Sequence, residues 1–526
     1  MTSPKRTSRP KSPSAKAPRP NASPSGTPSL TFSPEIAALL VRLRDHFAAR
    51  GVEAYCVGGV VRDAISGWAT ADVDIALHAA DVGSVAAEMA RSFTATLVPL
   101  DEERQVFRVV PAGGAYIDLT PVRGGGINAD LALRDFTIDA LAIPFDGLDL
   151  AYPSLLDPLG GIADLRAGTV RACGPGVFRE DPLRLLRGVR LAAEMCLVVE
   201  PSTQAMMREE HRLLATVTGE RTRDEFCRIL AAPGAVASLR LLDNLGLLTM
   251  IIPELEEARG VGQPKEHYWD VLQHSLETVG AMEQVLRQSQ GDPQFLDAIP
   301  WNAAFASYFQ RPTGGGRNRL LLAKLTALLH DISKPATKTV EPDGRIRFLG
   351  HPVKGAEVTE QIMERLRFTS QEVRMVSIMV EEHLRPGLIS RGANEPTRRA
   401  LYRFFRDAED VVVDTLFLSF ADYMAARGPL METDDWALYS GKIRDILSHW
   451  QEWLSVPPTV KLVDGHDIMR EFKLPPGPRI GSLLEAVMEG HASGEISSKE
   501  EALVLVGRLL HPKRGSAPAR GKAPAA

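Results

Sequence analysis

Asp72 and Asp74 are two carboxylates separated by one residue in the segment ADVDIAL. If this segment is a β-strand, both carboxylates point to one face, because side chains alternate along a strand, and Val73 and Ile75 point to the core. Two carboxylates held side by side can bind two magnesium ions, which activate an attacking hydroxyl and stabilise the leaving group of an in-line displacement at phosphorus. The pair therefore predicts metal-assisted transfer of a nucleotidyl group.

A glycine turn precedes this pair in the segment YCVGGVVRD. Gly58 and Gly59 have no Cβ, so the backbone N–H groups at the start of the next helix can approach a triphosphate, and the helix dipole favours the anion. Arg62 adds a charge-assisted contact to the same phosphates, and Asp63 follows it. A glycine pair alone more often marks a turn, and an Asp-x-Asp pair alone more often marks a solvated strand edge. Their combination indicates a nucleotide site.

The elements around these residues are those of a small α/β domain. Residues 35–50 have helical apolar spacing and end at Gly51, a favourable C-cap. From residue 52 to about 150, short strand-like segments alternate with helical ones. After Asp181 nearly every segment has helical spacing. The chain is therefore predicted to be an α+β multi-domain protein, with an α/β head followed by all-α domains.

The segment 55–77 resembles the signature of the class II tRNA nucleotidyltransferase and poly(A) polymerase family, whose catalytic head belongs to the polymerase-β-like superfamily. The next block, DLALRDFTIDALA, resembles the RRDFTxNA block of that family. This resemblance implies that Arg134 and Asp135 contact the ribose and triphosphate of the incoming nucleotide. Two positions depart from the family pattern: Leu133 stands where arginine is common, and Asp139 stands where asparagine is usual.

Asp118, in the segment YIDLTPVR, is a candidate for a third catalytic carboxylate. It occupies a position in a predicted strand from which its side chain could face the metals that Asp72 and Asp74 bind. An ordinary exposed acid explains the same pattern equally well. Magnesium is the cofactor expected in the head.

The block EDPLRLLRGVRLAAE resembles the EDxxR block with which the family selects the base. Asp181 and Arg184 are three residues apart, so on a helix they share a face. Arginine donates hydrogen bonds and ionised aspartate only accepts them. Cytosine and adenine present an amino group beside an unprotonated ring nitrogen, whereas guanine and uracil present a carbonyl beside a ring N–H. The Asp/Arg pair should therefore accept C and A and reject G and U without a nucleic-acid template. Arg187 and Arg190 extend the row toward phosphates; an amphipathic helix with a basic stripe is the alternative interpretation.

His330 and Asp331 end an apolar helix, LLLAKLTALLHD. An HD dipeptide alone is weak evidence, but His274 and Asp422 flank it in an order that resembles the HD phosphohydrolase superfamily. The resemblance implies one divalent metal, and imidazole with carboxylate suits manganese, nickel or cobalt. Accessory candidates for this site are Lys334, His351 and His383. A purely structural metal is as well supported as hydrolysis of phosphate esters or 2′,3′-cyclic phosphates.

Charge is unevenly distributed along the 526 residues, which carry a net charge of −5. Residues 1–34 hold six cations and residues 512–526 hold four, with no acids, so the part between them carries −15 and any RNA site there must be a local patch. Both tails are predicted to be disordered; a transit peptide is the less favoured alternative for the first.

No apolar run reaches the roughly 18–20 residues of a membrane span, and the four separated cysteines fit a reducing compartment, so we expect a cytoplasmic protein.

The resemblance implies an enzyme that adds C, C and A to the 3′ end of tRNA from CTP and ATP. A poly(A) polymerase or an enzyme that adds only CC or only A would share all motifs of the head. A rival of another class is an HD phosphodiesterase whose head only binds RNA. The predicted segments are a basic tail (1–34), a nucleotidyltransferase head (35–150), a helical neck (151–260), an HD domain (261–430), a C-terminal helical tRNA-binding region (431–511) and a second basic tail (512–526).

Overall fold

A computed structural model describes residues 29–70, 72–112, 115–150, 153–390, 396–455 and 461–511. The chain forms two compact units, Met1–Ile252 and Pro253–Ala526, hereafter unit 1 and unit 2. Most of the first predicted tail and all of the second lie outside the described residues. The finer division into six segments stays a prediction.

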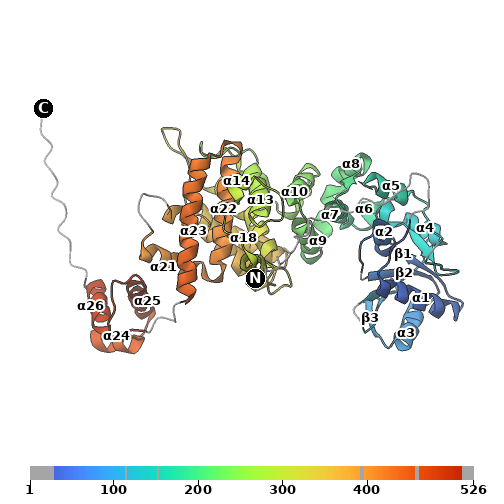
Figure 1. Cartoon of the computed structure of the whole chain (residues 1–526), viewed down its shortest axis with the longest axis horizontal. Coiled ribbons are helices and arrows are strands. Elements are labelled where there is room, and N and C mark those ends of the chain that lie inside the picture. Colours follow the sequence, from blue (N-terminus) through green and yellow to red (C-terminus); the bar gives the residue numbers. More distant parts are fainter. Residues whose placement is uncertain are drawn as a thin grey trace, which may run out of the picture. The chain divides into compact units, whose positions relative to one another are not determined.

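Unit 1 begins with a mixed α/β part, drawn in blue and cyan in Figure 1, and continues as helices. Its described strands are β1 (Glu53–Val57), β2 (Asp72–His78), β3 (Thr96–Asp101), β4 (Val106–Val110), β5 (Tyr116–Pro121), β6 (Ala142–Pro144), β7 (Thr169–Val170) and β8 (Val198–Val199). Its described α-helices are α1 (Pro34–Ala48), α2 (Gly59–Ser66), α3 (Val82–Phe93), α4 (Ile127–Ala132), α5 (Gly161–Ala167), α6 (Val177–Glu180), α7 (Arg184–Met195), α8 (Pro201–Glu210), α9 (Gly219–Ala231), α10 (Ala235–Asn244) and α11 (Leu248–Ile251). Two short 3-10 helices, η1 (Thr137–Asp139) and η2 (His211–Thr216), lie among them.

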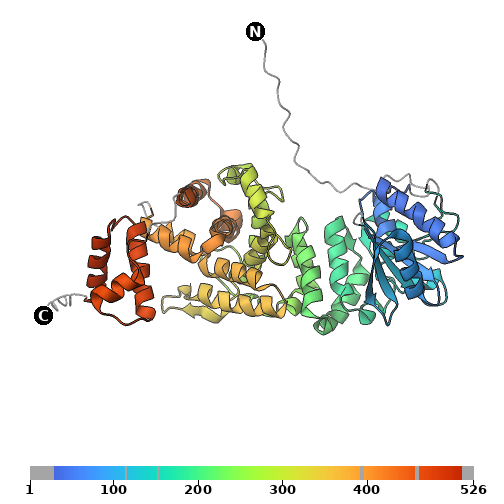
Figure 2. The ribbon, with the colours of Figure 1, turned by 90° about the horizontal axis from the view of Figure 1, so that it is seen from below.

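In the described part of unit 1, six strands form one sheet in the order β3-β4-β5-β2-β1-β6. The pair β2 and β5 is parallel, and the other neighbours in the sheet are antiparallel. Helix α3 packs on β3, β4 and β5, and His46 of α1 contacts Phe93 of α3, so the two helices cover the sheet together. Figure 2 shows the same blue helices from below.

Strand β2 has the alternation that its sequence predicts. Val73 and Ile75 are fully buried, whereas Asp72 is exposed and Asp74 is half-buried. Because successive side chains point to opposite faces, the apolar residues anchor β2 in the core and leave both carboxylates on the other face. The core thereby determines where the acids lie.

Unit 2 is helical apart from a small hairpin of β9 (Lys338–Val340) and β10 (Ile346–Phe348) in its described part. Its described α-helices are α12 (Leu255–Ala258), α13 (Val271–Val285), α14 (Pro293–Leu296), α15 (Ala303–Phe309), α16 (Arg319–Leu329), α17 (Lys334–Thr337), α18 (His351–Arg365), α19 (Ser370–Glu382), α20 (Arg385–Ile389), α21 (Arg398–Asp407), α22 (Val412–Arg427), α23 (Thr433–Ser455), α24 (Gly465–Phe472), α25 (Pro478–Ala492) and α26 (Lys499–Leu510). The 3-10 helices are η3 (Glu409–Val411) and η4 (Gly428–Leu430).

Helix α16 lies at the centre of unit 2, where it packs against α13, α19 and α22. Ten consecutive residues of this helix, 320–329, are buried. Lys324 is one of them, and its Nζ donates to Glu283 over 2.8 Å, which satisfies the one charge that this helix buries. The last three helices, α24 to α26, enclose a separate apolar cluster that includes Ile468, Val487 and Val506.

This architecture confirms the predicted α+β multi-domain class, with an α/β head followed by helices. None of the helices in the described part of the chain combines the length and the apolar character that crossing a membrane requires.

Candidate active site and metal centre

The turn between β1 and α2 brings the head site together. Gly58 is the N-cap of α2 and has φ 76° and ψ −136°, a backbone conformation that favours glycine. A Cβ at Gly58 would lie 3.2 Å from both Asp74 Oδ2 and Arg134 Nη1, so the turn is in close contact with a carboxylate of β2 and with the arginine after α4. Glycine is therefore needed here for space as well as for conformation.

Asp74 and Asp72 offer oxygen atoms that no other group uses. Within the described residues neither side chain has a hydrogen bond or an ion pair. Burial raises the pKa of Asp74 to about 6, and the nearby carboxylates of Asp118 and Asp139 add to the shift against the arginines. Unpaired carboxylate oxygens in one row are the donor set that magnesium prefers, so the residues present fit this ion.

Asp118 lies opposite Asp74 in the parallel register of β2 and β5. Both of its oxygens are taken by Arg108 of β4, whose Nε and Nη2 donate over 2.7 and 2.8 Å. The sequence predicts Asp118 near the metal-binding carboxylates but does not predict its partner Arg108, which lies on the neighbouring strand β4. In this arrangement Asp118 neutralises Arg108 beside the two open carboxylates.

A cavity of about 780 Å³ opens in unit 1. Asp72, Asp74 and Asp118 are not in its lining, but Arg134, which meets Asp74 at the Gly58 turn, is. Of the predicted nucleotide-binding residues, it is lined by Arg134, Asp135, Asp181, Arg184 and Arg187. Gly58, Gly59, Arg62, Asp63 and Arg190 are not in its lining.

The predicted base-selecting pair lies in this cavity, although only one member is helical. Arg184 is the first residue of α7, whereas Asp181 lies just before the helix in an extended conformation. The Asp181 carboxylate accepts from the Leu183 N–H over 3.2 Å and from Arg221 over 2.9 Å. Arg184 donates to the Leu133 carbonyl over 3.3 Å, so both side chains are held in place at the cavity wall.

The remaining arginines of this region are paired with acids. The Arg62 side chain is only 13% exposed and contacts Asp63 and Asp139. Arg187 pairs with Asp135 over 2.7 Å and approaches Asp139 at 3.6 Å. Arg190, by contrast, is buried against two glutamates of the helical part, Glu194 and Glu225.

A second cluster lies in unit 2, at the ends and faces of the helices around α16. His274 comes from α13 and Asp422 from α22, while His330 and Asp331 follow α16 directly. His274 Nε2 lies 3.2 Å from His330 Nε2, 3.3 Å from Asp331 Oδ2 and 3.1 Å from Asp422 Oδ1. The four predicted ligands therefore converge.

Two accessory candidates join the cluster through the other oxygen of Asp331. His351 Nε2 lies 3.3 Å and His383 Nε2 lies 3.7 Å from Asp331 Oδ1. Two groups with the spacing of metal ligands result, and Asp331 belongs to both: His274, His330 and Asp331, and then Asp331, His351 and His383. Lys334, the third accessory candidate, donates to Asp331 over 2.6 Å.

The histidines are oriented as metal ligands usually are. The Nδ1 atoms of His330, His351 and His383 each contact a backbone carbonyl, at 3.0, 2.7 and 2.6 Å, which directs Nε2 to the centre. The Nε2 atoms of His351 and His383 are buried and have no hydrogen-bond partner. Burial lowers the pKa of His383 to about 3, so its ring is neutral near pH 7. These orphaned nitrogens fit a divalent metal ion.

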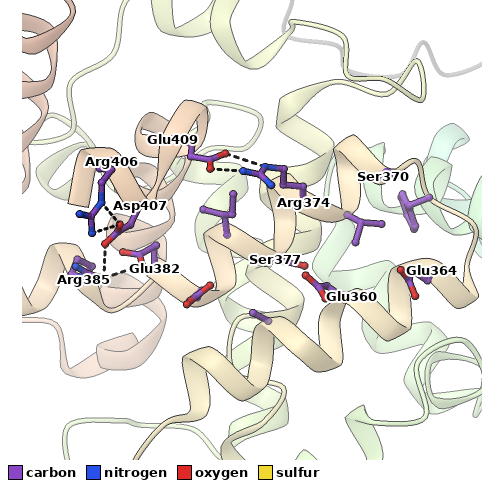
Figure 3. A pocket seen from close by; sticks show the side chains of 15 residues that line it. Glu360, Glu364, Ser370, Arg374, Ser377, Glu382, Arg385, Arg406, Asp407 and Glu409 are labelled. Carbon is purple, nitrogen blue, oxygen red and sulfur yellow. Dashed lines mark hydrogen bonds and ion pairs between the residues drawn. The ribbon is translucent and has the colours of Figure 1, made fainter. Parts of the chain in front are cut away.

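A second cavity, of about 870 Å³, lies in unit 2 between α18, α19 and α21, and no predicted site residue lines it. Figure 3 shows Glu382 there, beside Arg385 and Asp407. Glu382 accepts from Arg385 over 3.0 Å, but its Oε2 is buried without a partner. Burial raises the pKa of Glu382 to about 7, and the neighbouring Asp407 adds to this.

Glu382→Gln should therefore stabilise the protein above pH 7 by about 1–2 kcal/mol, allowing for screening at the cavity mouth. The folded state binds the Glu382 proton more tightly than the unfolded state, so the wild type loses stability as pH rises from about 4.5 to 7. The variant cannot ionise and avoids that loss. Urea unfolding at pH 5 and pH 8 measures the difference, with the exposed neighbour change Glu381→Gln as control; an equal effect at both pH values would contradict the prediction.

Comparison with known proteins places the chain in a family. Residues 54–171 match the family described as Poly A polymerase head domain, residues 196–259 match the probable RNA and SrmB-binding site of polymerase A, and residues 271–427 match the HD domain. The A-adding tRNA nucleotidyltransferase of Deinococcus radiodurans is 33% identical over 466 residues, which cover 88% of this chain and 96% of the relative. The CC-adding tRNA nucleotidyltransferase of Thermus thermophilus is 32% identical over 458 residues, covering 86% and 92%.

Solved structures share the fold at lower identity. The Thermotoga maritima CCA-adding enzyme complexed with tRNA has a TM-score of 0.57 and 19% identity, covering 91% of this chain and 96% of that chain. A CCA-adding enzyme with CTP has a TM-score of 0.60, also at 19% identity and with the same coverage. On the strength of the sequence relatives, which match along nearly their whole length, the chain belongs to the tRNA nucleotidyltransferase and poly(A) polymerase family, in the bacterial form that carries an HD domain.

Proposed function

We propose that this protein adds C, C and A to the 3′ end of tRNA, using CTP and ATP and no nucleic-acid template. One observation supports this most strongly: the unpaired carboxylate of Asp74 lies at the Gly58 turn, in the same unit as a cavity lined by Asp181 and Arg184. Residues that would hold the metal ions and a pair that would select the base are thus part of one unit. Two basic tails suit a substrate that is recognised by its phosphates and shape.

The residues of the head divide the work. Asp72 and Asp74 would hold magnesium, which supplies activation of the tRNA 3′-hydroxyl and neutralises charge on the triphosphate. Arg134 and Arg187 would bind the triphosphate, because both line the cavity and their guanidinium N–H groups can donate charge-assisted hydrogen bonds to phosphate oxygens. Gly58 keeps the backbone close to both Asp74 and Arg134. Cys56, Cys173 and Cys196 carry free thiols in the described part of the chain, which, with a tRNA substrate, favours a cytoplasmic location.

The test uses tRNA transcripts that end before C, before the second C or before A. The full chain is incubated with each transcript and with CTP, ATP, GTP or UTP alone and then with CTP and ATP together. Addition of CCA only with both correct nucleotides supports the proposal. A long run of A from ATP alone would show a poly(A) polymerase instead.

A second candidate is an enzyme that adds only part of CCA. It is favoured by the relatives that match over most of the chain, which include both an A-adding and a CC-adding enzyme. In the same assay, an A-adding enzyme extends only the transcript that ends in CC, and a CC-adding enzyme stops before A. The assay thus distinguishes an enzyme whose cavity accepts both C and A in order from one whose cavity accepts only one of them.

Asp181→Ala should relax base selection. Each good bidentate contact to a base contributes roughly 1–3 kcal/mol of discrimination, so misincorporation of G or U relative to C should rise about 5- to 100-fold. The acceptor of the base amino group is lost while the metal ligands stay in place. Single-nucleotide kcat/KM values for the four nucleotides measure the ratio, with the exposed Glu220→Ala as control; an unchanged ratio would show that Asp181 does not read the base.

We further infer that the cluster of unit 2 binds a divalent transition metal and hydrolyses phosphate monoesters or 2′,3′-cyclic phosphates at RNA ends. The two ligand groups that share Asp331 support the metal. A cavity of about 980 Å³ adjoins the cluster and contains Lys334, Arg345 and Arg347, which favour an anionic substrate. The test is conversion of a nucleoside 2′,3′-cyclic phosphate to the nucleoside monophosphate, and release of inorganic phosphate from a 2′-monophosphate, with manganese, nickel or cobalt supplied.

A further inference from the structure

Asp139 lies at the end of η1, between the glycine turn and helix α7. It is 2% exposed, and its carbonyl oxygen would lie 3.9 Å from a Cβ placed on Gly58. A buried carboxylate is costly unless it is paired, and its partners therefore show what it does.

The partners of Asp139 are the two arginines that flank the phosphate site. Arg62, from α2, contacts one oxygen of Asp139, and Arg187, from α7, lies 3.6 Å from the other. Although burial alone would raise it, the pKa of Asp139 is lowered by Arg62, Arg187 and Arg190, so the group is ionised. Asp139 is thus a shared counter-ion that joins α2 to α7.

The two arginines differ in what they can still offer to a ligand. The Arg62 side chain is 13% exposed and is also bound by Asp63, so little of its charge reaches the cavity. The Arg187 side chain is 44% exposed and lines the cavity while it also pairs with Asp135. Asp139 therefore reduces the positive potential of the surface that meets the nucleotide.

We propose that Asp139 is a positioning residue that holds Arg62 and Arg187 away from full engagement with the triphosphate and so weakens ground-state binding of CTP and ATP. This inference rests on the proposed nucleotidyl transfer. A nucleotide that binds equally tightly before and during the reaction gains affinity without gaining turnover. A buried counter-charge reduces that uniform binding for both nucleotides alike, because it acts on the phosphates that they share.

The alternative is that Asp139 only braces η1 against α2. A brace and a charge device predict opposite results for the isosteric change Asp139→Asn. Loss of a brace would misplace the arginines and raise KM. Loss of a counter-charge would leave the shape and strengthen the attraction between the arginines and the phosphates.

The experiment measures equilibrium binding of CTP and of ATP to the full chain by calorimetry, without tRNA so that no turnover occurs. For Asp139→Asn we expect about three- to tenfold lower Kd for both nucleotides, from one unit charge at roughly 10 Å in a solvent-accessible cleft. KM should fall in parallel, whereas kcat should change less than about twofold. The gain should shrink in 0.5 M salt, because screening weakens the added attraction.

Asp164→Asn is the matched control. Asp164 is also buried and paired with an arginine, Arg171, and it holds η1 by accepting from Thr137 over 2.6 Å. No contact joins it to Arg62 or Arg187 among the described side chains. Asp164→Asn should leave both Kd values unchanged, so a similar effect of both variants would identify a brace.

A double variant tests whether the effect of Asp139 on nucleotide binding acts through Arg187. In an Arg187→Gln background, Asp139→Asn should lower Kd less than it does alone, because one of the two arginines that it frees is missing. Unchanged or raised Kd for Asp139→Asn, or an equal gain with and without Arg187, would overturn the inference. Failure of the wild type to bind either nucleotide would instead count against the proposed function.

Discussion

Asp74→Ala is expected to lower kcat/KM for nucleotide addition by about 10³-fold or more. Metal ligation at the reacting phosphate supplies several kcal/mol of transition-state stabilisation, and each 1.4 kcal/mol is about tenfold in rate. Asp74 lies at the Gly58 turn, and both of its oxygens are unpaired. Asp72 is the other carboxylate on this face of β2, so the strand offers one substitute ligand at most. Initial rates of CTP and ATP incorporation measure the loss.

Two controls separate this effect from damage to the fold. Glu102→Ala removes an exposed acid of the same unit and should leave the rate unchanged. The melting temperature of Asp74→Ala should stay equal or rise slightly, because burial raises the pKa of Asp74 and its charged form costs stability above about pH 6. A wild type that incorporates no nucleotide, with a phosphodiesterase activity that survives Asp74→Ala and is lost in His330→Ala, would identify the HD cluster as the working enzyme and the head as an RNA-binding module.

Asp331→Ala is expected to remove metal from unit 2, with at least about 100-fold weaker binding. Loss of residues that only support metal ligands already costs 10- to 100-fold, and Asp331 belongs to both ligand groups. It is 1% exposed, and four histidines, His274, His330, His351 and His383, lie within 3.7 Å of its oxygens. Elemental analysis of the protein purified after growth with manganese, nickel or cobalt measures the metal content.

The matching control is His466→Ala, an exposed histidine of α24, which should leave the metal content as in the wild type. Any hydrolysis of 2′,3′-cyclic phosphates should disappear in Asp331→Ala, while CTP and ATP incorporation stays. The wild-type metal content in Asp331→Ala would show that the cluster is not the metal centre. Loss of incorporation as well would mean that unit 2 supports the head reaction.

Several residues of the head site could be predicted because their chemistry is local. The alternation of Asp72, Val73 and Asp74 puts two carboxylates on one face of any strand that buries Val73, and β2 does bury it. The glycine pair needs only the turn before α2. In the same way, His330 and Asp331 end a helix whose apolar residues place it in the core of unit 2.

Other features depend on which residues meet across the fold. Asp118 was expected beside the metals, and the register of β5 puts it opposite Asp74, yet Arg108 of the neighbouring strand occupies both of its oxygens. No spacing within YIDLTPVR contains that information. Asp181 was expected inside a helix with Arg184; it lies before the helix, and the bends of the chain still bring both into one cavity.

By itself, the sequence determined the types of the chemical groups, the faces on which they lie within each element, and the family. Tertiary structure alone decided the pairing of charges: Arg62 meets Asp139 from 77 positions away, and Asp331 is shared between two histidine groups. The physical reason is range. The periodicity of a helix or strand follows from backbone geometry within a few residues, whereas the partner of a charge depends on how distant elements pack, and packing is decided by the whole core.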